Sequence, residues 1–518
     1  MKKNPDSRLL AKTLFPLSLA LAALLHTACA TEYSLVEADT PYSRSYAVVV
    51  SKATYADPAW RNVADTLVRK HNATLIQHEG TPDNARADLA RHLARHTAFV
   101  ATPDECGRSY IARVHRLTRQ LDDDPWLDTQ WGVITGATPA AALRLVTESV
   151  QPFEIKKALA TTHLNETLFD EYFLLSDSPD PAGAWTWKKP DGTVQRGVNN
   201  LGKNDALVWA EHLEMSPDLI VTSSHGFENG VEMPLPLRRG IIRVFAGKLY
   251  PFADPRQTIP PANATPIAPT PNPKVYFPVG NCLVGHVNAP ECMVTTMMSR
   301  YGVNQLAGYT VNTWFGRAAW DMLAQWQTLP GRNSFSESFF FNQQHLLHDI
   351  AAIDPNALAY NPRLGPGPVE LRGHLLDMVA AKLKFDPRRI RNRGKDPDYQ
   401  LAGLLWDRDT LAFYGDPAWR ATLNHEKEPR FLRTHLHSRG DTHTLTLTIA
   451  NAPAAAQNTT PIGIPLTTRI KNIKLLEGHA HAPIIADNFI LILKPQPQPN
   501  QETITLKFTA DPIQPPSN

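Results

Sequence analysis

Apolar runs of strand length alternate with helical patterns through the first 150 residues, and this alternation limits the folds open to the chain. The runs cover residues 45–50, 74–77, 98–100 and 131–135. Between the first two, five apolar side chains fall on one helical face: Trp60, Val63, Ala64, Leu67 and Val68. Strands and helices that take turns predict a mostly parallel sheet with helices on both faces. No G-x-G-x-x-G follows any of these strands, so a dinucleotide site has no support.

The last part of the chain has a different period. Two segments there alternate apolar with polar residues, with Leu445, Leu447 and Ile449 in the first and Ile504, Leu506 and Phe508 in the second. This period predicts a small C-terminal β-sandwich of immunoglobulin type. We therefore expect an α/β fold in two subdomains, residues 31–203 and 204–430, followed by the β-sandwich at 431–518. A proline-dense insert at 251–273 is expected to form an exposed loop.

The N-terminus has the pattern of an export signal. Three basic residues (Lys2, Lys3 and Arg8) precede an apolar run at 14–25, which is too short to span a bilayer but suits a signal peptide. Cleavage after Ala30 would make residues 1–30 the signal, and lipidation at Cys29 is the alternative. The protein is therefore expected in the periplasm, on the outer surface or outside the cell. Its only expected membrane attachment is that lipid anchor.

Charge and cysteine content narrow the functional classes. Lysine plus arginine number 52 against 50 acidic residues among 518, and this near-neutrality argues against nucleic-acid binding. Outside the signal lie three cysteines, Cys106, Cys282 and Cys292. An odd number in an exported chain points to a free thiol rather than to a disulfide scaffold. We expect Cys106 and Cys292 in the core, Cys292 inside the helix that follows Cys282.

Two further strand-length runs each end in a reactive side chain beside a glycine. Residues 218–226 end in Ser-Ser-His225-Gly226, and residues 274–282 end in Gly-Asn-Cys282. Ligands gather at the carboxyl ends of strands in an open α/β sheet. Two adjacent strands of this kind would present His225 and Cys282 together, as a thiol nucleophile and its imidazole base. The N–H groups of Gly226 and Cys282 would then stabilise the developing oxyanion.

The same stretches resemble the gingipain family of the caspase-like cysteine peptidases. Strand-Ser-His225-Gly226 precedes strand-Gly-Asn-Cys282-Leu-Val-Gly285, and Gly415-Asp-Pro417 resembles the end of that family's catalytic domain. The resemblance extends over residues 45–518 as architecture. It implies a caspase-like fold and a cysteine endopeptidase that cleaves protein or peptide substrates through a thioester acyl-enzyme. It also implies that Asn312 and Trp314 line the substrate pocket, with core packing as the alternative for Trp314. Glu228, in the loop after Gly226, is a further candidate for substrate contact, with loop solvation as the alternative. No cofactor is required; family members often bind calcium, but no acidic cluster here singles out a site.

Other interpretations remain open. A catalytically silent surface-binding or adhesion protein would keep the same fold, and a self-processing peptidase would have the 251–273 loop as its substrate. Ser223 and Ser224 are not expected to be nucleophiles, because no G-x-S-x-G elbow surrounds them. His225, Cys282, His286 and Cys292 are ligand types that zinc accepts, but their spacing matches no compact zinc site, so no metal is predicted there.

Overall fold

The computed structural model describes residues 39–518, except 150–151, 179–180, 182, 200–203, 235–238, 329, 361–396, 425–430, 451–459, 496–502 and 514–518. The expected signal peptide, including Cys29, therefore lies outside the described residues. In the described part, no helix is both long enough and apolar enough to cross a membrane.

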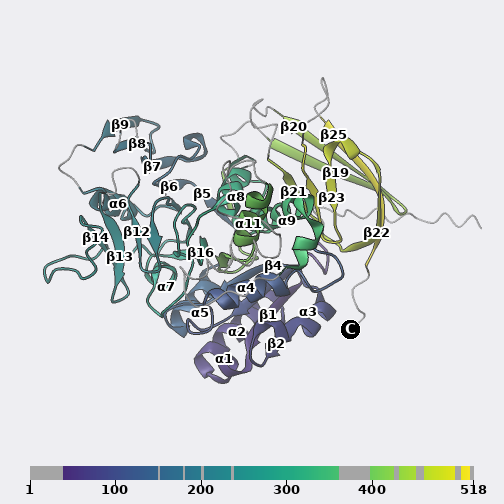
Figure 1. The fold of residues 1–518 in the computed structure, drawn as a ribbon, viewed down its shortest axis with the longest axis horizontal. Coiled ribbons are helices and arrows are strands. Elements are labelled where there is room, and N and C mark those ends of the chain that lie inside the picture. The colour runs from purple at the N-terminus through teal and green to yellow at the C-terminus, as the bar shows by residue number, and fades with distance from the viewer. Residues whose placement is uncertain are drawn as a thin grey trace, which may run out of the picture.

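One twelve-stranded sheet organises the α/β region, in the order β2-β1-β3-β4-β17-β16-β15-β10-β6-β7-β8-β9. Its first four strands are parallel to one another: β1 (Tyr46–Ser51), β2 (Thr74–His78), β3 (His96–Val100) and β4 (Gln130–Ile134). The helices of this part are α1 (Lys52–Ala56), α2 (Pro58–His71), α3 (Arg86–His92), α4 (Arg108–Leu117) and α5 (Pro139–Glu148). Figure 1 draws them in purple and blue at the bottom of the view. The predicted alternation is confirmed.

The caps of α2 show how the sequence sets its bounds. The Asp57 side chain accepts hydrogen bonds from the backbone N–H groups of Ala59 and Trp60, and Pro58 occupies the first helical position. At the other end Asn72 takes the left-handed conformation that terminates many helices. Between these caps, α2 buries the apolar face that the spacing predicts, with Trp60, Val63, Ala64 and Leu67.

The second half of the sheet contains five more parallel strands: β6 (Lys157–Ala160), β7 (Glu171–Leu175), β10 (Leu219–Val221), β15 (Lys274–Phe277) and β16 (Val303–Tyr309). The hairpin of β8 (Ala184–Lys188) and β9 (Val194–Val198) adds two antiparallel strands at its edge. Gly192 in the hairpin turn has φ +83°, a conformation that glycine adopts without strain.

A single strand joins the two halves. β17 (Leu411–Tyr414) pairs parallel with β4 and antiparallel with β16. The two halves of the sheet therefore run in opposite directions. This strand directly precedes the Gly415-Asp-Pro417 motif, and the sequence does not predict it, because four apolar residues carry little periodicity.

A small antiparallel sheet lies beside the large one: β11 (Gly226–Phe227), β12 (Gly230–Glu232), β13 (Ile241–Phe245) and β14 (Lys248–Phe252). The sequence did not predict it, and β14 takes the first two residues of the proline-dense insert. A separate pair consists of β5 (Phe153–Ile155) and β18 (Ala421–Leu423). The remaining helices are α6 (Asp205–Leu213), α7 (Met293–Arg300), α8 (Arg317–Thr328), α9 (Phe335–Ile353) and α11 (Pro397–Arg408).

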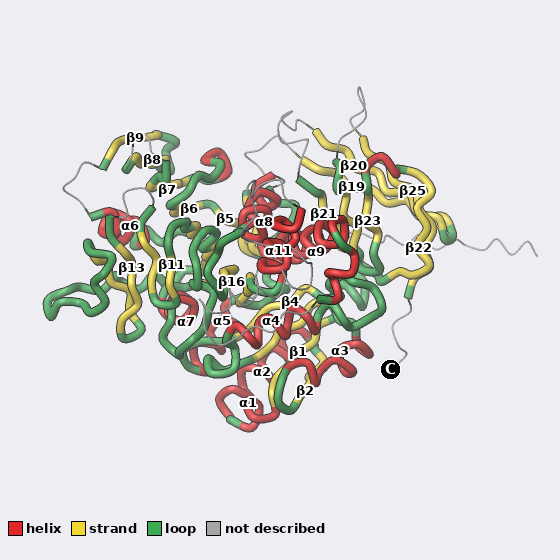
Figure 2. The backbone as a smooth tube through the Cα atoms, viewed as in Figure 1, coloured by secondary structure: helices red, strands yellow, loops and turns green. Residues whose placement is uncertain are grey.

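Two antiparallel sheets form the C-terminal part and share one core (Figure 1, yellow). The first is β19 (Phe431–Arg439), β20 (Thr442–Ala450), β25 (Thr503–Pro512) and β22 (Ile470–Glu477); the second is β21 (Ile462–Pro465), β24 (Phe489–Ile492) and β23 (Pro483–Ile485). Figure 2 shows α9 against the second sheet, where Phe489 packs on Phe340 and Phe341. The predicted fold class, an α/β sheet followed by small antiparallel sheets, is confirmed.

Candidate functional site

The two strands that carry the predicted dyad are neighbours. β10 and β15 pair in parallel register, with Val221 opposite Phe277. The pairing continues past the strand ends, because Thr222 N–H donates to the Phe277 carbonyl at 3.1 Å and Gly280 N–H donates to the Thr222 carbonyl at 3.4 Å. The segments that hold His225 and Cys282 therefore leave the sheet at the same edge, as the sequence predicts.

The loops beyond these strands touch through backbone atoms. A Cβ placed on Gly226 would lie 2.6 Å from the Cys282 carbonyl oxygen and 2.8 Å from the Asn281 Cβ. Only a residue without a side chain allows this approach, since real Cβ contacts stay beyond about 3 Å. Gly226 is thus required for its contact with the cysteine backbone.

Asn281 ties the two loops together. Its Nδ2 donates to the carbonyls of Ser224 at 3.1 Å and His225 at 3.2 Å, and its Oδ1 accepts from Thr222 Oγ1 at 2.7 Å. The side chain is fully buried, so these bonds are shielded from water. This role of Asn281 was not predicted from the sequence, in which its position directly before Cys282 is the only signal.

Cys282 is half-buried, and a backbone donor faces its sulfur. Thr313 N–H lies 3.2 Å from Sγ, within hydrogen-bond range for sulfur. Such a donor can stabilise the sulfur when it carries negative charge during the reaction. The N–H of Cys282 itself has no hydrogen-bond partner among the described residues, so it is available to a developing oxyanion. The next residue, Leu283, has φ +61°, an uncommon conformation for a leucine that marks a sharply turned loop.

His225 is exposed, and its backbone is held in place. Its carbonyl accepts from Glu232 N–H at 3.0 Å as well as from Asn281. Within the described part of the chain, no hydrogen bond joins the imidazole to the Cys282 thiol. Catalytic hydrogen bonds are often long in unliganded sites, so the missing bond does not exclude the dyad.

The Glu228 carboxylate faces the side chain of His286, and its predicted contact with substrate stays a prediction. Oε1 lies 3.2 Å from Nδ1 of His286, and Arg108 Nη2 lies 3.0 Å from the same nitrogen. One ring nitrogen either donates or accepts, so His286 uses Nδ1 with one of these partners at a time. Burial raises the pKa of Glu228, but the hydrogen bond from His286 and the nearby charges outweigh it, so the pKa is lowered overall. Arg108, which is buried, was not singled out by the sequence.

Asn312 and Trp314 flank the residue that contacts the sulfur. The Asn312 carbonyl accepts from Trp406 Nε1 at 3.2 Å. The Trp314 ring packs at 5.2 Å from Tyr399 and 6.1 Å from Trp406, between ring centroids. Both residues thus support the loop around Thr313, and their contact with substrate stays a prediction.

The other two cysteines are fully buried. Burial raises the pKa of Cys106 to about 12, and it also raises the pKa of Cys292. Such thiols are inert as nucleophiles. Cys292 lies immediately before α7 as its N-cap rather than inside the helix. Cys282 is therefore the accessible thiol of the three.

Acidic residues elsewhere form a separate group. Asp122, Asp128 and Asp487 are the one set of at least three metal-ligating side chains that lie together in the described residues. The Arg469 guanidinium contacts all three, at 2.7 Å from Asp122 and 3.4 Å from Asp128. This group therefore already has a cation, and it links the C-terminal sheets to the α/β region.

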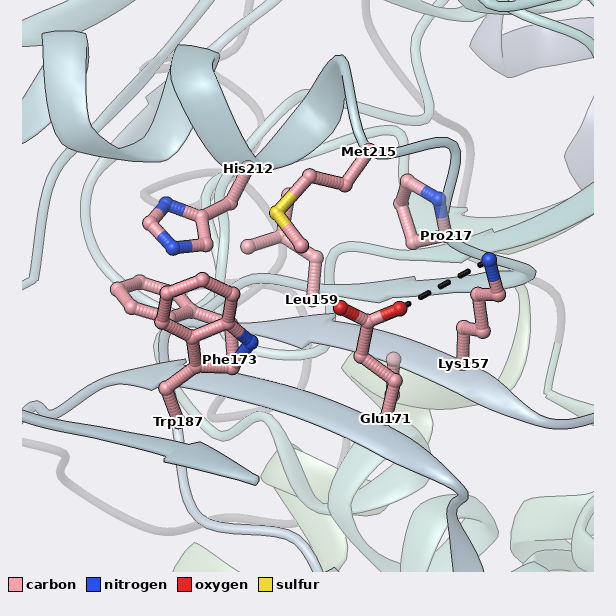
Figure 3. A pocket seen from close by; sticks show the side chains of 9 residues that line it. Lys157, Leu159, Glu171, Phe173, Trp187, His212, Met215 and Pro217 are labelled. Atoms are coloured by element: carbon pink, nitrogen blue, oxygen red, sulfur yellow. Dashed lines mark ion pairs between the residues drawn. The ribbon is translucent and has the colours of Figure 1, made fainter. Parts of the chain in front are cut away.

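A small pocket lies between β6, β7, β8 and α6 (Figure 3). The ring of His212 stacks on Phe173 with centroids 3.4 Å apart, and Lys157 pairs with Glu171 at 3.7 Å. Its volume is about 20 Å³, enough for one water molecule. A pocket of this size does not hold a peptide side chain, and neither His225 nor Cys282 lines it.

No family model and no curated protein match the chain. Similar solved structures include a complex of the RgpB pro- and mature domains of Porphyromonas gingivalis, with 10% identity, 89% of this chain and 99% of that chain covered, and a TM-score of 0.39. A second is the Arg-specific cysteine proteinase gingipain R, with 10% identity, 92% and 99% coverage, and a TM-score of 0.36. The likeness is weak and concerns the fold alone.

Proposed function

We propose that the chain is an exported cysteine endopeptidase that uses Cys282 as nucleophile and His225 as general base. The observation that carries the proposal is the junction of the β10 and β15 ends, where Gly226 packs directly on the Cys282 backbone. Export rests on the signal pattern at residues 1–30. Protein or peptide substrates follow from the resemblance of the motifs.

The reaction proceeds in two halves. His225 takes the thiol proton, and the thiolate adds to the peptide carbonyl to give a tetrahedral oxyanion. The N–H groups of Cys282 and Gly226 are the proposed donors to that oxygen. The C–N bond then breaks, the leaving amine takes the proton from the imidazolium, and a thioester remains. Water, deprotonated by His225, hydrolyses the thioester and restores the thiol. No step needs a cofactor, and calcium is assigned no site.

Self-processing has one specific observation in its favour. The loop after β14 is anchored where Ile267 N–H donates to Leu249 and Tyr301 Oη donates to Ile267. Between the end of β14 and this anchor at Ile267, the side chains of Arg256 and Ile259 are exposed. An anchored loop with an exposed middle is the kind of segment at which proteolysis concentrates.

The test compares the mature protein with Cys282→Ala and with Cys106→Ala as a matched control. Each is incubated with a mixed-sequence peptide library, and the products are identified by mass spectrometry. We expect cleavage by the unmutated protein and Cys106→Ala and none by Cys282→Ala, with unchanged circular dichroism. Cleavage that persists in Cys282→Ala would refute the assignment. Silence from all three would favour a binding protein, and the intact masses would reveal self-processing.

A further inference from the structure

A cavity of about 520 Å³ lies where β1, β3 and β4 begin, apart from the dyad. Tyr46, His96 and Gln130, the first residues of these strands, line it. The last turn of α2, the start of α9 and the segment after β17 complete its walls. A volume of this order matches small-molecule sites in proteins.

The walls are strongly basic. Besides two histidines, five lining side chains are cationic at neutral pH and one, Glu337, is anionic; the cations are Arg44, Arg69, Lys70, Arg95 and Arg420. Burial and the Arg95 charge lower the pKa of His96 to about 3, so that ring is neutral. The N-terminus of α9, a helix of 19 residues, adds a positive dipole end at Ser334.

Internal ion pairs account for only part of this charge. Glu337 forms ion pairs with both Arg420, at 2.8 Å, and Arg95, at 3.6 Å. The buried Asp416 carboxylate contacts both Lys70, at 2.9 Å, and His71, at 2.8 Å. Each carboxylate is thus shared by two bases, and five cations against two carboxylates leave a net positive cavity.

Two arginines account for most of the excess positive charge of the cavity. Among the described residues, Arg69 has no carboxylate partner and Arg44 pairs only with Asp39, which is exposed and does not line the cavity. Arg95 has a buried Nε–H without a hydrogen-bond acceptor in the described part of the chain. A buried guanidinium N–H without an acceptor is costly, so an oxygen of a bound anion would satisfy it.

We propose that this cavity binds a small molecule that carries two or more carboxylate or phosphate groups. Arginine forks match the planar and tetrahedral oxyanions of these groups, which explains the predominance of arginine over lysine in the walls. The inference is independent of the proposed peptidase, because none of the lining residues belongs to the dyad or its loops.

Isothermal titration calorimetry on the full mature chain tests the proposal. The probes are citrate, pyrophosphate and, as an uncharged compound of similar size, glucose. Arg69→Gln removes an exposed cation of the lining, and Arg95→Gln removes one that is largely buried. Arg256→Gln is the matched control, because it deletes the same charge from an exposed loop that does not line the cavity.

We expect saturable binding of citrate or pyrophosphate, weakened about tenfold or more in Arg69→Gln and Arg95→Gln and unchanged in Arg256→Gln, with no heat from glucose. Binding of citrate alone would identify carboxylates as the preferred groups, and binding of pyrophosphate alone would identify phosphates. Absence of saturable binding by either anion would overturn the proposal. Equal affinities in Arg69→Gln and Arg256→Gln would also overturn it, and Arg69→Gln keeps this test valid if Arg95→Gln fails to fold.

Discussion

The Glu228 carboxylate lies 3.2 Å from Nδ1 of His286, and this pair joins the loop after His225 to the loop after Cys282. Glu228 follows the histidine by three residues and His286 follows the cysteine by four. The backbone reinforces the link, since Met293 N–H donates to the Glu228 carbonyl at 2.7 Å. The pair therefore fixes the relative position of the two proposed catalytic groups.

Glu228→Gln keeps the size of the side chain and removes its charge. We expect kcat for peptide cleavage to fall about tenfold with little change in KM, because small misplacements of catalytic groups cost rate rather than binding. Glu291→Gln, an exposed acid in the same region of the chain, serves as control and should retain full activity. A rise in KM that varies between substrates, with kcat unchanged, would show instead that Glu228 contacts the substrate.

Gly226→Ala would place a Cβ against the Cys282 carbonyl. The backbone must move to relieve an overlap at 2.6 Å, so we expect loss of peptidase activity and destabilisation by about 1–3 kcal/mol. Urea unfolding and a peptide assay measure the two effects. At Gly107 an added Cβ would meet its nearest atom at 3.7 Å, so Gly107→Ala should leave both nearly unchanged. Full activity in Gly226→Ala would show that the close contact is not needed.

The backbone N–H of Thr313 can be tested separately from the Thr313 side chain. Thr313→Pro deletes the donor to Sγ, whereas Thr313→Ala keeps it. We expect iodoacetamide to alkylate Cys282 about fivefold more slowly in the proline variant, because a charge-assisted bond to the thiolate is lost. The alanine variant should react at the original rate. Equal rates in both variants, with native circular dichroism, would exclude this donor as an activating group.

The ionisation of Glu337 should make the stability of the protein fall as the pH is lowered into the acid range. Burial opposes its ionisation, but Arg420, Arg95 and the Ser334 N–H overcome that cost and hold the pKa at about 2, against about 4.3 for a free glutamate. A lowered pKa means that the stabilisation, roughly 3 kcal/mol, is complete above pH ~4.3 and is lost as the pH falls toward 2.

Urea unfolding from pH 7 to 2 tests this expectation. Glu337→Gln should be less stable than the unmutated protein at neutral pH, and the difference should shrink as the pH falls through that window. Glu79→Gln, which breaks an exposed pair with Lys52, should show little difference at any pH. A gap for Glu337→Gln that stays constant down to pH 2 would contradict the lowered pKa.

The sequence predicted the local features well. The apolar face of α2 and the pairing of the two motif strands both follow from periodicity within short windows. The residues that contact the site from distant parts of the chain could not be predicted in this way. Thr313 lies 31 residues beyond Cys282, and Arg108 lies 178 residues before His286. Such contacts depend on how distant elements pack, which no local pattern specifies. The basic cavity was missed for the same reason, since six separate segments contribute to it.

The position of β17 has a consequence for how the chain reaches its native state. It is the last of the twelve strands in sequence, yet it occupies an inner place in the sheet, between β4 and β16. Until residues 411–414 arrive, those two strands are open edges with unpaired backbone groups, which invite pairing with other chains. Closure at so late a stage also implies slow, non-local folding. A protein of this topology depends on its last sheet strand to protect two aggregation-prone edges during biosynthesis.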